Sequence, residues 1–259
     1  MGLSVNTNVA ALNAYRNLSS TQNDMGKSLE KLSSGFRINR AADDAAGLAI
    51  SEGMRSQMGG ITVGVRNAQD AISVVQTAEG ALNETTSILQ RMRDLTVQGA
   101  NEGGLTSDAV DNIQAEITAL TTTLNDIAAN TTFNGTALLD GGYTGTFQVG
   151  ANGGETVSVA IGTAMDSTGL GISALTALDG TNATATTNLG LIDTAINTVS
   201  TTRAGLGASQ NQLEHVINNA NVALENVTAS ESRIRDTDMA SEMVNYTRTQ
   251  ILSQAGTAM

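Results

Sequence analysis

Paired carboxylates and a histidine are the residue types in this chain that could carry out acid–base or metal chemistry. Asp43 and Asp44 are adjacent, and two neighbouring carboxyl groups can divide the roles of acid and base. Arg37 and Arg40 lie just before them, which favours ion pairing and helix capping instead. His215 is the single histidine, and the chain has no cysteine. A zinc site or an H-E-x-x-H motif needs further ligands, so we interpret His215 as a solvated or ion-paired residue on a helix surface.

A glycine-rich stretch, residues 150–155, is the other candidate for chemistry, since glycine loops can cradle phosphate. No lysine and no helix start follow it. The flanking segments 146–149 and 156–161 have the pattern of strands, so we predict a β-hairpin here. The sequence contains neither a Walker loop nor a dinucleotide fingerprint. We therefore predict no enzyme, no cofactor and no bound metal.

One long segment dominates the elements that would position any site. From Leu189 to Ile234 a heptad series runs without a break, which is typical of a helix lying along another helix. The series is Leu189, Ile192, Ile196, Val199, Arg203, Leu206, Gln210, Leu213, Ile217, Ala220, Leu224, Val227, Glu231 and Ile234. Such a helix is not stable alone, because fixing its backbone costs more than burial of its apolar seam returns. It needs a partner of matching length.

Two runs in the N-terminal half of the chain have the same spacing and supply that partner. One covers residues 61–93 and the other residues 110–127. Ser107 or Asp108 is the expected N-cap of the second run. The sequence therefore predicts a three-stranded helical bundle closed within a single chain.

The two ends of the chain are similar in composition, and we predict that they pair as helices. Residues 239–252 carry apolar positions among Gln, Thr and Ser, and residues 3–34 carry the stripe Val9, Leu12, Tyr15, Leu18, Met25, Leu29 and Leu32. Residues 33–40 interrupt the periodicity, so we interpret them as an ordered linker. A helix of small residues follows over 41–58, and we expect Gly59-Gly60 to break it briefly.

The segment between the second and third heptad runs differs in character. Residues 131–188 are rich in Gly, Thr, Asn and Asp, and Asn134-Gly135 is a turn signal. The predicted fold class is therefore mainly α: a long antiparallel heptad-repeat helical bundle with paired N- and C-terminal helices and a small β-hairpin region.

Charge is distributed unevenly along the chain. The formal net charge is −12, and residues 94–202 contain 11 acidic residues with no Lys or Arg. This favours near-neutral ends that pack densely and an acidic middle that stays in water, and it argues against nucleic acid as a partner. No apolar run approaches the ~18 residues of a membrane span, and residues 1–8 lack the basic and apolar regions of a cleavable signal, so we expect no membrane insertion.

Several stretches taken together resemble bacterial flagellins. Near the N-terminus they are Asn6-Thr7-Asn8, Ala10 to Ala14, and Leu32 to Ile50, which contains Arg37-Ile38-Asn39-Arg40-Ala41-Ala42-Asp43-Asp44. Near the C-terminus they are Gln212-Leu213-Glu214-His215, Glu231-Ser232-Arg233-Ile234-Arg235-Asp236, and Gln250 to Met259. The stretches occur in the family's order and cover the chain except for about residues 145–187.

The resemblance implies a structural subunit that assembles with copies of itself into the extracellular helical filament of the bacterial flagellum and transmits motor torque. It implies a discontinuous inner domain, D0, of residues 1–42 and 237–259, and a bundle domain, D1, of residues 43–236 with its hairpin insert at about 131–188. Outer D2 and D3 domains are expected to be absent. A hook–filament junction protein, which shares the terminal design, is the alternative.

The resemblance also implies export through the flagellar type III pathway, with a flagellar export chaperone and cap and hook-associated proteins as partners. Flagellins usually continue beyond the Gly-Thr-Ala-Met stretch, so we expect the C-terminal part of D0 to be truncated here. Whether the native chain continues past Met259 stays open.

Two sets of residues follow from the resemblance. Gln90 to Leu95 and Ile113 to Ile117 resemble the D1 segments bound by the host Toll-like receptor 5, which implies Arg91, Leu95 and Glu116 as receptor contacts. Without the resemblance these residues would be interpreted as ordinary bundle surface. We expect the inter-domain linker and assembly residues to be Gly35, Arg37, Asn39, Arg40, Asp43 and Asp44.

Overall fold

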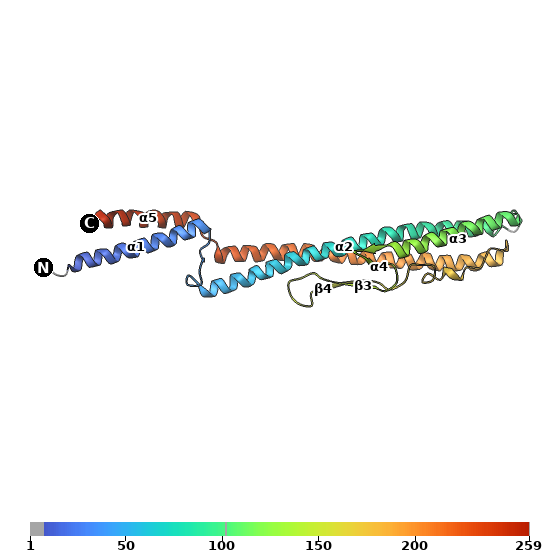
Figure 1. Cartoon of the computed structure of the whole chain (residues 1–259), viewed down its shortest axis with the longest axis horizontal. Helices are drawn as coiled ribbons and strands as arrows, with labels where there is room; N and C mark the ends of the chain where they lie inside the picture. Colours follow the sequence, from blue (N-terminus) through green and yellow to red (C-terminus); the bar gives the residue numbers. More distant parts are fainter. Residues whose placement is uncertain (1–7, 102, 259) are drawn as a thin grey trace. The chain divides into compact units, whose positions relative to one another are not determined.

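The computed structural model describes residues 8–101 and 103–258, and most of these residues are helical (Figure 1). The helices are α1 (Val9–Ser34), α2 (Ala45–Gly99), α3 (Ser107–Asn130), α4 (Asn182–Arg235) and α5 (Met239–Ala258). The strands are β1 (Thr132–Phe133), β2 (Thr136–Ala137), β3 (Tyr143–Gln148) and β4 (Thr156–Ile161), and a short 3-10 helix, η1, spans Ile172–Ala174. The predicted fold class is confirmed. The start of the predicted N-terminal helix, residues 3–7, lies outside the described residues, as do Asn6, Thr7 and Met259 of the family-like stretches.

The chain divides into two compact units, and each is described by itself. The first comprises Met1–Gly59 and Val222–Met259, and the second comprises Gly60–Asn221. Both boundaries fall inside long helices, α2 and α4. The division into D0 and D1 implied by the resemblance concerns layers of a filament and stays a prediction.

The core of the second unit is shared by α2, α3 and α4, which run side by side in Figure 1. Three ion pairs or hydrogen-bonded pairs also join these helices: Arg91 with Glu116, Arg93 with Asp193 and Arg203 with Glu79. The predicted three-helix bundle within one chain is therefore confirmed. The Arg203–Glu79 pair, at 3.7 Å, explains why two charged residues occupy heptad positions of facing helices.

Helix α2 buries a wider face than its heptad series predicts. Besides the heptad positions, a second row of mostly small residues is buried, namely Ala71, Val74, Ala78, Thr85, Met92 and Thr96. The second row follows from the number of neighbours, because α2 packs against α3 and α4 and also meets the β3–β4 hairpin. In α4 every second heptad position is buried as far as Leu213, namely Ile192, Val199, Leu206 and Leu213, and the other heptad positions, including all that follow Leu213, are half-buried.

The expected break at Gly59-Gly60 is wrong, because α2 continues without interruption from Ala45 to Gly99. Its start is also later than the expected residue 41. A glycine lowers helix stability by only about 1 kcal/mol relative to alanine, so tertiary packing can hold it in a helix. Here the glycines allow close approach: a Cβ on Gly60 would lie 2.8 Å from the Ala151 Cβ, and one on Gly64 would lie 2.5 Å from the Val149 carbonyl oxygen.

The predicted β-hairpin is confirmed, with its first strand starting earlier than expected, and the Asn134-Gly135 turn signal lies in a second, shorter hairpin. Strands β3 and β4 pair antiparallel, with Gln148 opposite Thr156 across the glycine-rich loop, and every second residue of β4 is buried. The Asn67 side-chain amide donates to the Gln148 carbonyl at 2.9 Å and fastens this hairpin to α2. Strands β1 and β2 are joined by Asn134 and Gly135, whose φ angles of 50° and 79° are those of a type I′ turn.

Buried or half-buried amide side chains attach the returning segment, residues 162–181, to the bundle. Asn125 accepts from the Ser167 backbone N–H at 2.8 Å, and Gln114 accepts from the Leu178 N–H at 3.0 Å. Asn188, only 3% exposed, both accepts from the Thr176 N–H and donates to its carbonyl. These bonds satisfy backbone groups of an irregular segment whose β-pairing is limited to a bridge between Ala164 and Asp140 in the described chain. The N-cap of α3 is Thr106 rather than Ser107 or Asp108, since its hydroxyl accepts from the Ala109 N–H.

Candidate functional site

The predicted linker is an ordered turn held by backbone pairing with the segment between α4 and α5. Gly35 ends α1 in the left-handed conformation, at φ 77°, and its N–H donates to the Lys31 carbonyl. The Arg37 N–H then donates to the Arg235 carbonyl at 2.6 Å, and the Thr237 N–H donates to the Gly35 carbonyl at 2.9 Å. Two strands of chain, separated by about two hundred residues in sequence, thus form a single antiparallel bridge.

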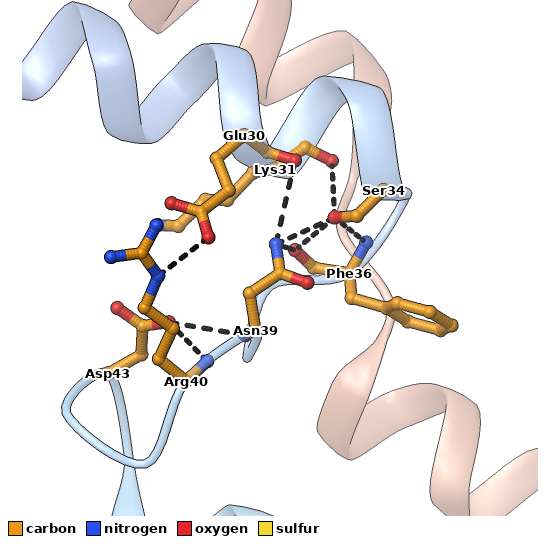
Figure 2. Close-up of polar contacts among 7 residues, drawn as sticks. All are labelled: Glu30, Lys31, Ser34, Phe36, Asn39, Arg40 and Asp43. Atoms are coloured by element: carbon orange, nitrogen blue, oxygen red, sulfur yellow. Dashed lines mark hydrogen bonds and ion pairs between the residues drawn. The ribbon is translucent and has the colours of Figure 1, made fainter.

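Asn39 organises the turn through its side chain (Figure 2). Its amide donates to the Ser34 Oγ at 2.7 Å, and the same hydroxyl accepts from the Phe36 N–H. The Arg40 guanidinium Nε donates to Glu30 Oε1 at 2.8 Å, which ties the far side of the turn back to α1. The predicted linker residues therefore lie in one hydrogen-bonded network.

Asp43 and Asp44 act as caps in this network. Asp43 Oδ2 accepts the backbone N–H groups of Arg40 and Asn39 at 2.9 and 3.1 Å, and these bonds hold the pKa of the Asp43 carboxyl below its ordinary value. Asp44 Oδ1 accepts the Gly47 N–H at 2.9 Å at the start of α2. Each carboxylate serves a different stretch of backbone, so the pair is arranged for capping.

The guanidinium groups of the two linker arginines bond elsewhere than to these aspartates. Arg40 pairs with Glu30, and the Arg37 guanidinium donates to the Ile234 carbonyl at 2.7 Å. Arg37 therefore strengthens the bridge between the linker and the end of α4.

A third arginine, which the sequence reasoning did not single out, completes the linker. The Arg235 guanidinium lies over the Phe36 ring, 4.8 Å from its centroid, and its NH1 donates to Glu52 of α2 at 2.9 Å. The side chain is only 13% exposed, and its buried Nε has no hydrogen-bond partner. Its position within the family-like Glu231 to Asp236 stretch was the available signal.

The three predicted receptor contacts lie on α2 and α3 in the second unit. Arg91 Nε donates to Glu116 Oε1 at 2.8 Å, and these side chains are 54% and 43% exposed. Leu95, in contrast, is 2% exposed and belongs to the core. A partner that approached this face would therefore contact the ion pair, with Leu95 supporting the backbone beneath it.

The pairing of the terminal helices is confirmed, and the two helices contribute different residues to their seam. Helices α1 and α5 pack side by side (Figure 1). The half-covered positions of α1 include the apolar residues Leu18, Met25 and Leu32, and Leu18 lies next to Gly256 of α5. The half-covered positions of α5 follow heptad spacing and, apart from the aromatic Tyr246, are small or polar, namely Glu242, Thr249, Ser253 and Gly256. No residue of α5 is buried. Nine other large apolar residues of the two helices remain about half exposed or more: Val9, Leu12, Tyr15, Leu29, Met239, Met243, Val244, Ile251 and Leu252.

His215 is exposed on α4. Over the residues that the structure describes, no three His, Asp or Glu side chains are grouped as a metal site would require. Within the same residues, none of the helices combines the length and apolar character needed to cross a bilayer.

Comparison with known families decides what kind of protein has this arrangement. The family description "Bacterial flagellin N-terminal helical region" matches residues 5–144, and "Bacterial flagellin C-terminal helical region" matches residues 189–259. The chain belongs to the bacterial flagellin family. Flagellins are structural, non-enzymatic subunits of the extracellular flagellar filament that drives motility, and this chain is such a subunit.

Individual flagellins are similar over almost the whole length. The chain is 49% identical to the flagellin of Bacillus subtilis strain 168, with 98% of this chain and 94% of the relative covered. It is 40% identical to flagellin FlaB1 of Treponema pallidum strain Nichols, with the same coverage.

Solved structures agree with this assignment. The crystal structure of Bacillus cereus flagellin superposes with a TM-score of 0.53 at 34% identity and covers 60% of this chain and 88% of that chain. A putative flagellar hook-associated protein from Vibrio parahaemolyticus gives a TM-score of 0.64 at 16% identity, covering 75% of this chain and 100% of that chain, which shows a shared fold alone. The identity to filament flagellins therefore favours the filament subunit over the junction-protein alternative.

Proposed function

We propose that copies of this chain pack against one another in the filament through the outward faces of α1 and α5. The single observation that carries the proposal is the large apolar surface that this helix pair leaves exposed. The half-covered positions of α5 are mostly small or polar, while nine large apolar side chains of α1 and α5 are 48% to 71% exposed. We call these nine residues of α1 and α5 the outward face.

The distribution of exposed apolar residues over the described chain supports this choice of surface. In the second unit, large apolar residues of comparable exposure are confined to Val63 and Val97, at 49% and 48%. Contiguous exposed apolar surface on a protein marks an interaction site. Burying the remaining half of a large apolar side chain gains about 0.7–1.5 kcal/mol, so nine of them supply a strong drive for association.

Seeded polymerisation of the purified full chain tests the proposal. Ile251→Gln with Leu252→Gln should leave the helical circular dichroism unchanged and abolish or strongly slow growth on filament fragments. Gln250→Ala, at an exposed polar position of the same helix, is the matched control and should grow like the wild type. Growth of the double variant at the wild-type rate would contradict the proposed face.

We assign the linker network a role in assembly as well. Residues Gly35, Arg37, Asn39, Arg40, Asp43 and Asp44 hold one defined path from α1 to α2, which a subunit repeated many times in one lattice requires. The partners implied by the resemblance, an export chaperone and cap and hook-associated proteins, belong to this proposal too, with the outward face as a surface they could bind before assembly.

A second proposed function, as a ligand of the host Toll-like receptor 5, is favoured by the exposed pair on α2 and α3. Arg91 and Glu116 present a fixed cation and anion side by side on a rigid helical surface, and Arg is common among residues that dominate binding. Leu95 is assigned a supporting role beneath them.

Binding of variants to the purified receptor ectodomain tests this second function. Arg91→Ala and Glu116→Ala should each weaken binding by roughly tenfold or more, as expected for a central contact worth about 1.4 kcal/mol. Arg203→Ala, which removes another interhelical ion pair of the bundle, is the control and should bind normally. Equal affinity of all three variants would refute the assignment.

A further inference from the structure

We propose that Met239 and Met243 are a site of oxidation by peroxides, and that their conversion to methionine sulfoxide blocks incorporation of a subunit into the filament. The inference rests on the outward face proposed above. It adds a chemical modification and a class of reagent to that face, together with a consequence for growth.

Position and exposure single out these two thioethers. They lie one helical turn apart on α5 and are 48% and 52% exposed. The methionines of the bundle core, Met92 and Met165, have exposures of 0%. Met25, Met54 and Met58 are half-buried.

The composition of the chain concentrates two-electron oxidation on methionine. The sequence has no cysteine, so the methionine thioethers are its only sulfur groups. It also has no tryptophan, another side chain that oxidants attack. Susceptibility to peroxide follows access to the sulfur atom. In the unassembled subunit the reagent therefore meets Met239 and Met243 first among the described methionines.

The reaction balances without any further component. The sulfur lone pair attacks one peroxide oxygen, the O–O bond breaks, and that oxygen bonds to sulfur while the other leaves as water. Sulfur is oxidised by two electrons and hydrogen peroxide is reduced by two. The product is a polar, chiral sulfoxide that accepts hydrogen bonds and has no donor.

The consequence follows from where the sulfoxides would lie. An apolar interface has no hydrogen-bond donors for the two new sulfoxide oxygens. Each oxygen would be buried without a partner, at the free-energy cost of an unpaired polar group. Oxidised subunits should therefore join a filament poorly. Subunits already in a filament have the same sulfur atoms covered, so existing filaments should resist the reagent that stops growth.

The experiment compares free subunits with preformed filaments of the full chain, each treated with hydrogen peroxide and analysed by peptide mass spectrometry. In free subunits the peptides containing Met239 and Met243 should gain oxygen before the peptide containing Met92, and in filaments they should be protected. Treated subunits should then elongate seeds roughly tenfold more slowly than untreated ones, the size expected for one unpaired polar group. Met1 and Met259 remain in every variant, so any effect of their oxidation is common to all.

Two variants separate the possible outcomes. Met239→Leu with Met243→Leu should polymerise equally with and without peroxide, and Met239→Gln with Met243→Gln should polymerise slowly without any oxidant. If untreated wild type grows on seeds and oxidised wild type grows equally fast, this inference fails while the outward face stands. If the leucine variant still loses growth after peroxide, the inhibition arises elsewhere and the assignment is overturned. If the Ile251 and Leu252 substitutions leave growth intact, it is the proposed function that fails.

Discussion

Substituting Gly64 by alanine tests how α2 and the β3–β4 hairpin are held together. A Cβ at this position would lie 2.5 Å from the Val149 carbonyl oxygen and 2.7 Å from its carbon. Ordinary contacts between such atoms are roughly 3.5–4.0 Å, so helix and hairpin would have to separate by about 1 Å. Both atoms belong to backbone, and no side-chain rotation can relieve the overlap.

The magnitude follows from three opposing effects. Alanine favours the helix by about 0.8–1.0 kcal/mol over glycine. Overpacking at a close contact costs about 1–3 kcal/mol, and the Asn67–Gln148 hydrogen bond, now 2.9 Å, would lengthen and lose up to about 1 kcal/mol. We therefore expect Gly64→Ala to destabilise the second unit by about 0–3 kcal/mol, in contrast to the gain that helix propensity alone would give.

Gly80 offers a matched control in the same helix. A Cβ there would meet nothing within 4 Å, so Gly80→Ala should stabilise the chain by about 1 kcal/mol through helix propensity alone. Denaturant unfolding followed by circular dichroism measures both variants, and hydrogen exchange over residues 143–161 reports the hairpin directly. A Gly64→Ala variant as stable as Gly80→Ala, with unchanged exchange in the hairpin, would refute the close-approach argument.

Three further predictions follow from single contacts. Asn188→Ala removes the two hydrogen bonds that the buried Asn188 side chain makes to the Thr176 backbone and, at about 0.5–1.5 kcal/mol each, should cost about 1–3 kcal/mol in denaturant unfolding; no loss would mean that the anchor is dispensable. Arg235→Leu should destabilise the first unit by about 1–3 kcal/mol and speed hydrogen exchange over residues 35–40, whereas Glu52→Gln, at a side chain 54% exposed, should cost less than about 1 kcal/mol. Because its two backbone bonds lower the folded-state pKa of Asp43, their stabilisation is fully present above the ordinary value of 3.8 and is lost as the pH falls through the lowered pKa. Exchange of the linker amides, corrected for its intrinsic pH dependence, should rise over that range in the wild type and be flat in Asp43→Asn.

The helices and both hairpins of this chain could be predicted from its sequence because each carries a local periodic signal. The heptad series of α4 and the Asn134-Gly135 turn each specify one geometry with little help from the rest of the molecule. The continuity of α2 through Gly59-Gly60 could not be predicted. The hairpin end at Val149 to Ala151, nearly ninety residues further along, packs closely against α2 at Gly60 and Gly64 and leaves no room for a Cβ there. The sequence around these glycines does not show that contact.

The candidate site was only partly predictable for a related reason. The capping aspartates and the left-handed glycine of the linker are local features, which is why matching stretches could point to them, and their role in assembly stays a prediction. Arg235 was missed because its role depends on Phe36 and Glu52, which come from distant parts of the sequence. The burial of Leu95 could not be predicted from the sequence, because a leucine at helical spacing fits a core and a contact surface equally well.

The terminal helices show where the ordinary rule of apolar residues inside fails. Applied to α5, the rule assigns Met243 and Ile251 to the seam with α1, whereas the seam holds Thr249 and Gly256. The rule assumes that the single chain is the folding unit. For a filament subunit the inside of the molecule is completed by other copies, so apolar periodicity indicates a buried face without saying which chain buries it.

The exposed apolar surface of α1 and α5 links the folding of these terminal helices to assembly. In the single chain α5 buries no residue and α1 buries only Ser28, so little apolar burial opposes their opening, and they should belong to the least stable part of the molecule. Contacts made only in the filament stabilise whatever conformation they select. Covering the outward face in a filament would therefore order the same helices that present it. The bundle carries 15 acidic residues against 4 arginines over Gly60–Asn221, and its apolar residues are largely buried within its own core.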